Sequence, residues 1–215
     1  MRKKVLILAG APGAGKGTIK QKIMQIWEKE GKTFSNLETS AILKKDTKFQ
    51  EIMARGDLVK DEDVIRALHG PLQTAKENIM LDNIILDGFP RTIMQGMWLQ
   101  RLNWFEFKIL KLEANEEDII QRVLNRRICP NCNATYNLLT KELRPIRDGF
   151  CDKCNSELVI RKDDAEIKKR LIEYHSKTEE TIEYLKKERM EYYEIDSNNI
   201  LTEGFIEDLL KEMAI

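Results

Sequence analysis

The fold is decided by the stretch Gly10-Ala11-Pro12-Gly13-Ala14-Gly15-Lys16-Gly17-Thr18. It follows an apolar run at 5–9, typical of a buried strand, and precedes a helical pattern that ends at Gly31. In this context glycines let backbone N–H groups turn inward around phosphates, and the helix N-terminus adds positive charge. Lys16 would neutralise the outer phosphates of a nucleoside triphosphate. The alternative, a glycine turn that binds nothing, is disfavoured by strand, spacing and lysine together.

One position departs from the general form of a phosphate loop. Gly17 stands directly after Lys16, where most such loops carry the Ser or Thr that touches Mg²⁺. The hydroxyl arrives one residue later, at Thr18. This arrangement fits fewer classes of nucleotide-binding protein than the general form of the loop does.

Composition excludes several classes of function. The 215 residues carry 36 basic and 36 acidic side chains, and this balance favours neither a nucleic-acid binder nor a membrane-surface protein. No stretch approaches the roughly 20 apolar residues of a membrane span. The apolar run after the basic N-terminus is too short for a signal peptide and leads into the loop. We expect a cytoplasmic protein.

Alternating strands and helices predict an α/β fold with a five-stranded parallel sheet flanked by helices. A helix is expected from Asp61 to Gly70-Pro71, and a long helical stretch after Asp163-Asp164. The expected strands are 5–9, 34–37, 83–87, 105–112 and 192–196. The expected domains are a core formed by 1–35, 71–127 and 161–215, a helical insertion at 36–70 that binds a monophosphate, and a lid at 128–160.

Polar groups gather after the strand at 83–87, in Asp87-Gly88-Phe89-Pro90-Arg91-Thr92. In open α/β sheets, ligands bind at the carboxyl ends of the strands. Arg122 and Arg126 are four residues apart and therefore share one face of a predicted helix. Unless a phosphate partner exists, a merely solvated pair is the simpler interpretation of these arginines.

Four cysteines fall in one segment, as two Cys-x-x-Cys pairs. Their spacing predicts a tetrahedral zinc site with no open position, which indicates a structural metal. Cytoplasmic redox conditions disfavour disulfides, and iron is the competitor for the same ligands. A segment with so little apolar content would use the metal in place of a core. The predicted ligands are Cys129, Cys132, Cys151 and Cys154.

Three motifs in this order make the chain resemble adenylate kinase: the loop at 10–18, the Asp87–Thr92 motif, and Arg161-Lys162-Asp163-Asp164. The resemblance covers 4–213 and includes the metal-bearing lid of the long bacterial type. It implies transfer of the γ-phosphoryl group of ATP to AMP, giving two ADP, with Mg²⁺ as cofactor and Zn²⁺ in the lid. It also implies a monomer whose partners are ATP and AMP, and from composition we expect neither a nucleic acid nor a membrane as partner.

The resemblance also assigns roles to individual residues. Asp87 matches an acidic residue that holds Mg²⁺ through water, and Gln95 matches the side chain that reads the adenine edge. The implied ATP site comprises Gly10, Gly13, Ala14, Gly15, Lys16, Gly17, Thr18, Arg122 and Arg126. The implied AMP site comprises Thr39, Lys44, Leu58, Val59, Gly88, Arg91, Gln95, Arg161 and Arg170. The implied catalytic residues are Lys16, Asp87, Arg91, Arg126, Arg161 and Arg170.

The departures from the family pattern fall mainly on the acceptor side. Where the family has Thr-Gly-Asp-Met-Leu-Arg, this chain has Thr39-Ser40-Ala41-Ile42-Leu43-Lys44. Lys44 keeps the positive charge but loses the bidentate fork, and Ala41 replaces an acidic residue near the metal. The spacing from Asp164 to Arg170 is also about two residues shorter than the family pattern implies. Two alternatives therefore stay open: a kinase for CMP, UMP or GMP, and a nucleotide-binding regulator with weakened turnover.

Overall fold

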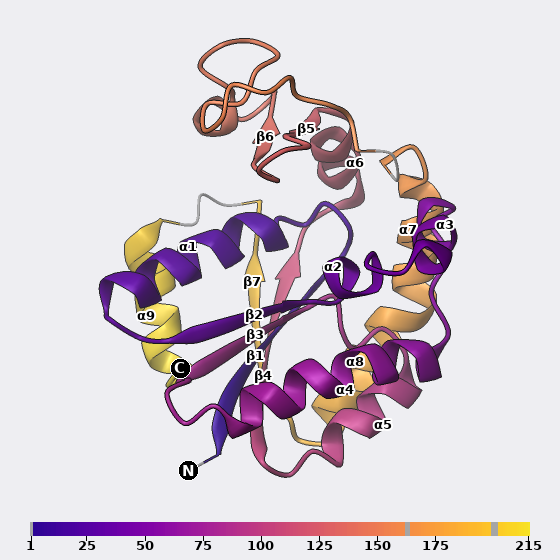
Figure 1. Ribbon diagram of the computed structural model, residues 1–215, viewed down its shortest axis with the longest axis vertical. Helices are drawn as coiled ribbons and strands as arrows, with labels where there is room; N and C mark the ends of the chain where they lie inside the picture. Colours follow the sequence, from indigo (N-terminus) through magenta and orange to yellow (C-terminus); the bar gives the residue numbers. More distant parts are fainter. Residues whose placement is uncertain (1, 162–163, 199–201) are drawn as a thin grey trace.

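A parallel sheet forms the centre of the computed structural model, which describes residues 2–161, 164–198 and 202–215. Its strand order is β2-β3-β1-β4-β7 (Figure 1). Every adjacent pair is parallel, which confirms the five-stranded parallel sheet predicted from the sequence. The chain leaves β1 to build one side of the sheet and returns to build the other, which places a topological switch point at the carboxyl end of β1. The strands are β1 (Lys3–Gly10), β2 (Phe34–Glu38), β3 (Asn83–Asp87), β4 (Phe105–Glu113) and β7 (Glu191–Asp196).

Helices cover both faces of the sheet, so the central strand is buried on both sides. Leu6 and Leu8 of β1 belong to one hydrophobic cluster, whereas Val5 and Ile7 belong to the other. The first cluster contains α1 (Lys16–Lys29), α6 (Glu116–Leu124), α7 (Ile167–Glu173) and α9 (Glu203–Glu212). The second contains α2 (Thr39–Leu43), α4 (Asp61–Glu77), α5 (Ile93–Gln100) and α8 (Glu180–Lys187), with α3 (Thr47–Ala54) packed against it.

The helix α4 is longer than the sequence predicts. It does not end at Gly70-Pro71 but continues to Glu77. Pro71 removes one backbone hydrogen bond, a cost of about 3 kcal/mol in a helix interior. The apolar stripe nevertheless continues beyond the proline, and burying Leu72 and Ala75 offsets much of that cost. The prediction was wrong here because tertiary burial outweighs the local breaker.

The helical stretch expected after residue 164 is present, but it is divided. A π-helical segment, Tyr174–Glu179, separates α7 from α8. The residues before it pack into one hydrophobic cluster and those after it into the other. The wider turn shifts the apolar stripe from one face of the core to the other. Lys162 and Asp163 of the Arg161–Asp164 motif lie outside the described residues.

The segment around the cysteines extends beyond the sheet at the top of Figure 1. It contains the antiparallel pair β5 (Arg126–Ile128) and β6 (Thr135–Asn137), followed by a short 3₁₀ turn at Lys141–Leu143. Its hydrophobic cluster is small, comprising Cys129, Ala134, Tyr136, Cys151 and Leu158. The boundaries of this lid and of the helical insertion stay predictions. Within the described residues, no helix combines the length and apolar content that a membrane span requires.

Candidate active site

The loop at 10–18 lies between the end of β1 and the start of α1. Gly10, Gly13 and Gly15 have φ values of 138°, 91° and 97°, a region that favours glycine. A Cβ at Gly13 would also lie 2.7 Å from Cγ2 of Val123, and one at Gly10 would lie 2.7 Å from the Leu112 carbonyl oxygen. The curled backbone therefore requires glycine for both conformation and space.

Lys16 opens α1 and folds back over the loop. Its Nζ donates to the carbonyl oxygens of Gly10 at 2.6 Å and Ala11 at 2.8 Å. Burial lowers the pKa of Lys16, the negative charge of Asp87 raises it, and the positive charges of nearby arginines lower it again, with a net pKa of about 7. A buried cation with a depressed pKa is a group that gains by meeting phosphate oxygens. The arginines that act on it are Arg91, Arg126 and Arg170.

Asp164 joins two of these arginines. It is 4% exposed and accepts hydrogen bonds from Nε and Nη2 of Arg126. Its Oδ1 also lies 3.7 Å from Nη1 of Arg170. The carboxylate thus holds both guanidinium groups near Lys16. The structure places Arg122 differently, since its Nη2 donates to the Ser197 carbonyl at 3.0 Å.

A small cavity is lined by residues from α2, from the segment before α4 and from the end of β3 to α5. Most of the predicted acceptor residues line it, but Lys44, Arg161 and Arg170 do not. Thr39 is 4% exposed, and its hydroxyl has no hydrogen-bond partner within the described part of the chain, which suits a polar ligand. The lining includes Thr39, Leu58, Val59, Gly88, Arg91 and Gln95, together with the hydrophobic Leu43, Met53 and Val64.

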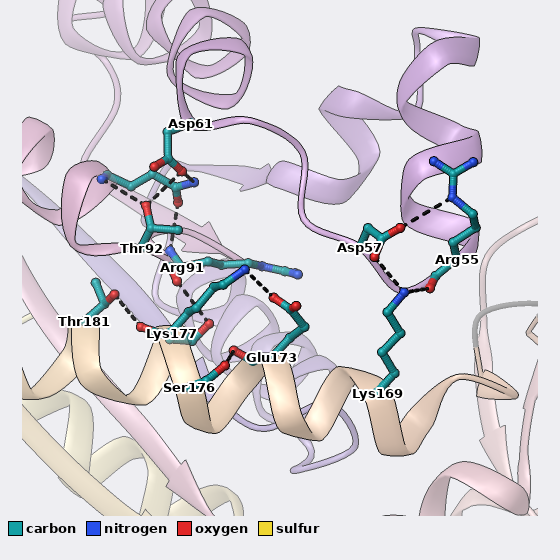
Figure 2. Close-up of polar contacts among 12 residues, drawn as sticks. Arg55, Asp57, Asp61, Arg91, Thr92, Lys169, Glu173, Ser176, Lys177 and Thr181 are labelled. Carbon is teal, nitrogen blue, oxygen red and sulfur yellow. Dashed lines mark hydrogen bonds and ion pairs between the residues drawn. The ribbon is translucent and has the colours of Figure 1, made fainter.

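The Gln95 side chain is held in a fixed orientation at this cavity. It is 2% exposed; its Oε1 accepts from the Arg91 backbone N–H, and its Nε2 donates to Oδ1 of Asp61, both at 2.8 Å. The Thr92 hydroxyl donates to the same Asp61 oxygen at 2.8 Å (Figure 2). Arg91 is positioned by its Nε, which donates to the Gly88 carbonyl at 3.0 Å. The amide is therefore oriented before any ligand enters.

Sequence reasoning missed a buried lysine beside Asp87. Lys20 donates to Oδ2 of Asp87 at 2.7 Å and to Oε2 of Glu38 at 2.9 Å. Burial would lower the pKa of Lys20, but the charges and hydrogen bonds of Asp87 and Glu38 raise it. The available signal was a lysine among the apolar residues of the helix face, Ile19 and Ile23. Glu38 and Asp61 were missed as well, because only tertiary contacts reveal their partners.

The four cysteine sulfurs meet in the lid. Every Sγ lies within 4.8 Å of the other three. The distance is 3.3 Å from Cys129 to Cys154, 3.4 Å from Cys132 to Cys151 and 3.6 Å from Cys132 to Cys154. A tetrahedral zinc with Zn–S bonds of about 2.3 Å separates its sulfurs by about 3.8 Å. Hydrogen bonds from Ser156 lower the pKa of Cys154 to about 5 and so favour the thiolate. The cluster fits a structural metal.

A larger hollow, of about 440 Å³, lies between β7 and α9. Its lining includes Tyr192, Tyr193 and Phe205 together with acidic side chains. None of the predicted site residues lines it, and its lining contains no cation that could meet a phosphate. This hollow therefore lacks the positive charges that a phosphate site needs, whereas several positive charges converge around Lys16.

Comparison with known proteins agrees with this geometry. The adenylate kinase family model matches residues 8–190. An adenylate kinase of Petrotoga mobilis is 36% identical, over 97% of this chain and 94% of its own length. An adenylate kinase of Caldicellulosiruptor bescii is 39% identical over 84% of this chain and 86% of its own. One from Thermoanaerobacter sp. is 36% identical over 97% of both chains.

Proposed function

The chain belongs to the adenylate kinase family, and we propose that it transfers the γ-phosphoryl group of ATP to AMP, forming two ADP in a reversible reaction. One observation supports this most directly. The cavity that contains Arg91 and Gln95 lies beside the phosphate loop. The positive charges of Arg91, Arg126 and Arg170 lower the pKa of Lys16 in that loop. A donor site and an acceptor site would therefore meet at one group of cations.

The donor half of the proposal rests on the loop. Phosphoryl transfer needs little covalent chemistry from a protein; it needs alignment and positive charge around the moving group. Backbone N–H groups of 10–18 would hold the triphosphate, with Lys16 on its transferring end. Arg126 and Arg170, held together by Asp164, would stabilise the charge that spreads over the equatorial oxygens. Arg122 and Arg161 are proposed as further phosphate contacts from the lid side.

The metal that accompanies ATP would be held at the end of β3. The Asp87 carboxylate and the Thr18 hydroxyl are oxygen donors, the class of ligand that Mg²⁺ prefers. When bound with ATP, Mg²⁺ would neutralise the phosphate oxygens and favour transfer. Lys20 fixes the position of the Asp87 carboxylate by donating a hydrogen bond to it.

The acceptor half of the proposal rests on Gln95 and Arg91. The Gln95 amide keeps one N–H beyond its bond to Asp61 and one lone pair beyond its bond to Arg91, and adenine offers a matching acceptor and donor on one edge. Arg91 would pair with the acceptor's phosphate as a charge-assisted fork. The unpartnered Thr39 hydroxyl would bind there too. We propose Lys44 as a weaker phosphate contact, because it is exposed and does not line the cavity.

Two features of the lid complete the proposal. Closure of 128–160 over the site would exclude water and so favour transfer over hydrolysis of ATP. The four cysteines would hold Zn²⁺ as a structural ion, because a closed set of four thiolates leaves no coordination position for substrate. We also propose, from composition and family resemblance, that the protein acts as a cytoplasmic monomer.

Product analysis tests the proposal. Purified protein with Mg-ATP and AMP should form two ADP for each ATP consumed, and the same mixture should be reached from ADP alone. Nucleotides separated by chromatography at several times give the stoichiometry. Binding of ATP without any ADP would support the regulator alternative instead. Formation of ADP with CMP, UMP or GMP, but not with AMP, would replace the proposed acceptor.

A further inference from the structure

Lys20 occupies an unusual place for a lysine. It lies one turn after Lys16 on α1, on the face that packs into the core, and only 8% of it is exposed. Its helical neighbours on this face, Ile19 and Ile23, are fully apolar and buried. Lysine is almost never this deeply buried unless its charge is paired. The partners of the ammonium therefore explain why it is there.

The partners are two carboxylates on adjacent strands. Glu38 ends β2 and Asp87 ends β3, and the two residues are directly opposite each other in the parallel register. Lys20 Nζ lies 2.9 Å from Oε2 of Glu38 and 2.7 Å from Oδ2 of Asp87. The Ser40 hydroxyl donates to the remaining oxygen of Glu38 at 2.8 Å. Like charges placed opposite each other in a sheet repel, and the ammonium between them removes that repulsion.

We propose that Lys20 is a positioning residue that acts as the resident cation of the Glu38–Asp87 pair. It fixes the Asp87 carboxylate and takes the place that a divalent cation would otherwise occupy between the two side chains. The nucleotide-free protein then has no site for a free divalent cation at the ends of β2 and β3, and metal enters only as a complex with nucleotide. The last part rests on the proposed function; the exclusion of free cations does not.

The chemistry of the pair supports this inference. Two carboxylates that share one ammonium, on neighbouring strands about 4.8 Å apart and with a hydroxyl beside them, form an oxygen donor set of the kind that Mg²⁺ and Mn²⁺ prefer. The ammonium is a compact point charge with three donors, so it can satisfy both carboxylates at once. Removing its charge leaves both carboxylates without the ammonium that pairs with them in a partly buried place. A free divalent cation can then take the place between the two carboxylates that the ammonium filled.

The test measures Mn²⁺ binding to nucleotide-free protein by electron paramagnetic resonance. The lid cysteines are first saturated with Zn²⁺, so that they do not take up Mn²⁺. Lys20→Met keeps the length of the side chain and removes its charge, and we expect it to bind one Mn²⁺ about tenfold or more tightly than the unaltered protein does. Lys20→Arg, which keeps the charge, should bind no more tightly than the unaltered protein.

Two further variants make the result specific. Lys29→Met removes another paired lysine from the same helix, one whose partner Glu203 lies on α9, and it should leave Mn²⁺ affinity unchanged. Adding Glu38→Gln to Lys20→Met should abolish the gained site. Circular dichroism and thermal unfolding check that each variant is folded. If Lys20→Met is not folded, Lys20→Gln, which keeps a hydrogen-bond donor, is measured with the same expectation.

The outcomes separate this inference from the proposed function. A folded Lys20→Met or Lys20→Gln protein that binds Mn²⁺ no more tightly than the unaltered protein overturns the role of Lys20. A gained site that persists in the Glu38→Gln double variant also overturns it. The binding measurement needs no turnover, so a protein that gains the site yet forms no ADP contradicts only the proposed function. As a second readout, excess free Mg²⁺ should inhibit phosphoryl transfer by the Lys20→Met variant and not by Lys29→Met.

Discussion

At the scale of single residues, Lys16 and Lys20 show how one helix gives two lysines opposite pKa shifts. Burial and surrounding arginines depress the pKa of Lys16 to about 7, whereas two carboxylates raise that of Lys20. The phosphate-loop motif predicts Lys16, because its spacing from the glycines is local. It does not predict the pairing of Lys20 with Glu38, because that contact depends on the register of β2 against β3.

The depressed pKa of Lys16 predicts that ATP binding takes up protons. With its pKa lowered to about 7, Lys16 loses its proton in the free protein as the pH rises above that value, and bound phosphates would restore the proton. At pH 8.5 we therefore expect uptake of about one proton per site, and Mg-ATP affinity that falls as the pH rises above about 7. Titration calorimetry in buffers of different ionisation enthalpy measures the uptake. Lys16→Met should show none, and an unaltered protein that binds Mg-ATP without proton uptake contradicts the assigned pKa.

The lowered pKa of Lys16 also determines whether the free energy of unfolding rises or falls with pH. The pKa of Lys16 is lower in the folded state than its ordinary value of 10.5, so between these two values the unfolded chain binds more protons. This residue alone therefore makes the free energy of unfolding rise with pH from about 7 to about 10.5. Urea unfolding of the unaltered protein and Lys16→Met across this range measures the difference. A difference that falls with pH would contradict the shift.

Removing the Asp61 carboxylate should lower both the free energy of unfolding and the affinity for the acceptor. Asp61→Ala leaves the Thr92 hydroxyl and the Gln95 amide without their acceptor, which we expect to cost about 1–3 kcal/mol. The freed amide should raise the KM for AMP more than it lowers kcat. The matched control is Asp63→Ala, which removes an acidic residue from the same first turn but breaks only an exposed pair with Arg66. Equal effects of the two variants would show that Asp61 acts only through the helix terminus.

At the scale of elements, helix α7 is tied to the turn that follows α3. Lys169 Nζ lies 2.6 Å from Oδ1 of Asp57 and donates to the Arg55 carbonyl at 2.9 Å (Figure 2). A Cβ at Gly56 would lie 3.3 Å from Cβ of Glu166, so the turn also packs closely against the start of the helix. This contact was not predictable from the sequence, because it joins segments more than a hundred residues apart.

Loss of the Lys169 contact should weaken binding of the acceptor and leave the rate of phosphoryl transfer nearly unchanged. Leu58 and Val59 follow the turn directly and line the acceptor cavity, so loosening the turn should raise the KM for AMP about two- to fivefold with kcat nearly unchanged. Lys169→Met tests this, with Lys168→Met, an exposed neighbour, as control. Steady-state kinetics at saturating Mg-ATP give both constants. A fall in kcat at constant KM would mean that α7 acts on the transfer step instead.

We expect the metal bound by the cysteine segment to stabilise the fold more than it contributes to catalysis. Its small hydrophobic cluster cannot hold the lid alone, so chelation should lower the Tm by at least about 5 °C. The initial rate at low temperature should fall much less. Differential scanning calorimetry and assays with and without chelator measure the two effects. Lost activity at an unchanged Tm would indicate a catalytic metal.

At the scale of the whole molecule, the sequence predicted the parallel sheet because each buried strand is a short apolar run with a helical pattern behind it. Burial on both faces of β1 confirms that interpretation. The length of α4 and the division of the last long helix could not be predicted, since both depend on which cluster each apolar stripe meets. In the site, motifs located the loop, Asp87 and Arg91, but not the carboxylates that orient Gln95, Lys20 and the arginines.

The central claim is that the donor loop faces an acceptor site that reads adenine. Its most direct test is the initial rate of ADP formation from Mg-ATP with AMP, CMP, UMP or GMP as acceptor, expressed as kcat/KM for each. We predict that AMP exceeds every other acceptor by about tenfold or more, because the fixed Gln95 amide presents one donor and one acceptor that match the adenine edge. We also predict that Lys16→Ala nearly abolishes the rate with AMP. A higher kcat/KM for another monophosphate, or an ordinary rate without Lys16, would contradict the account.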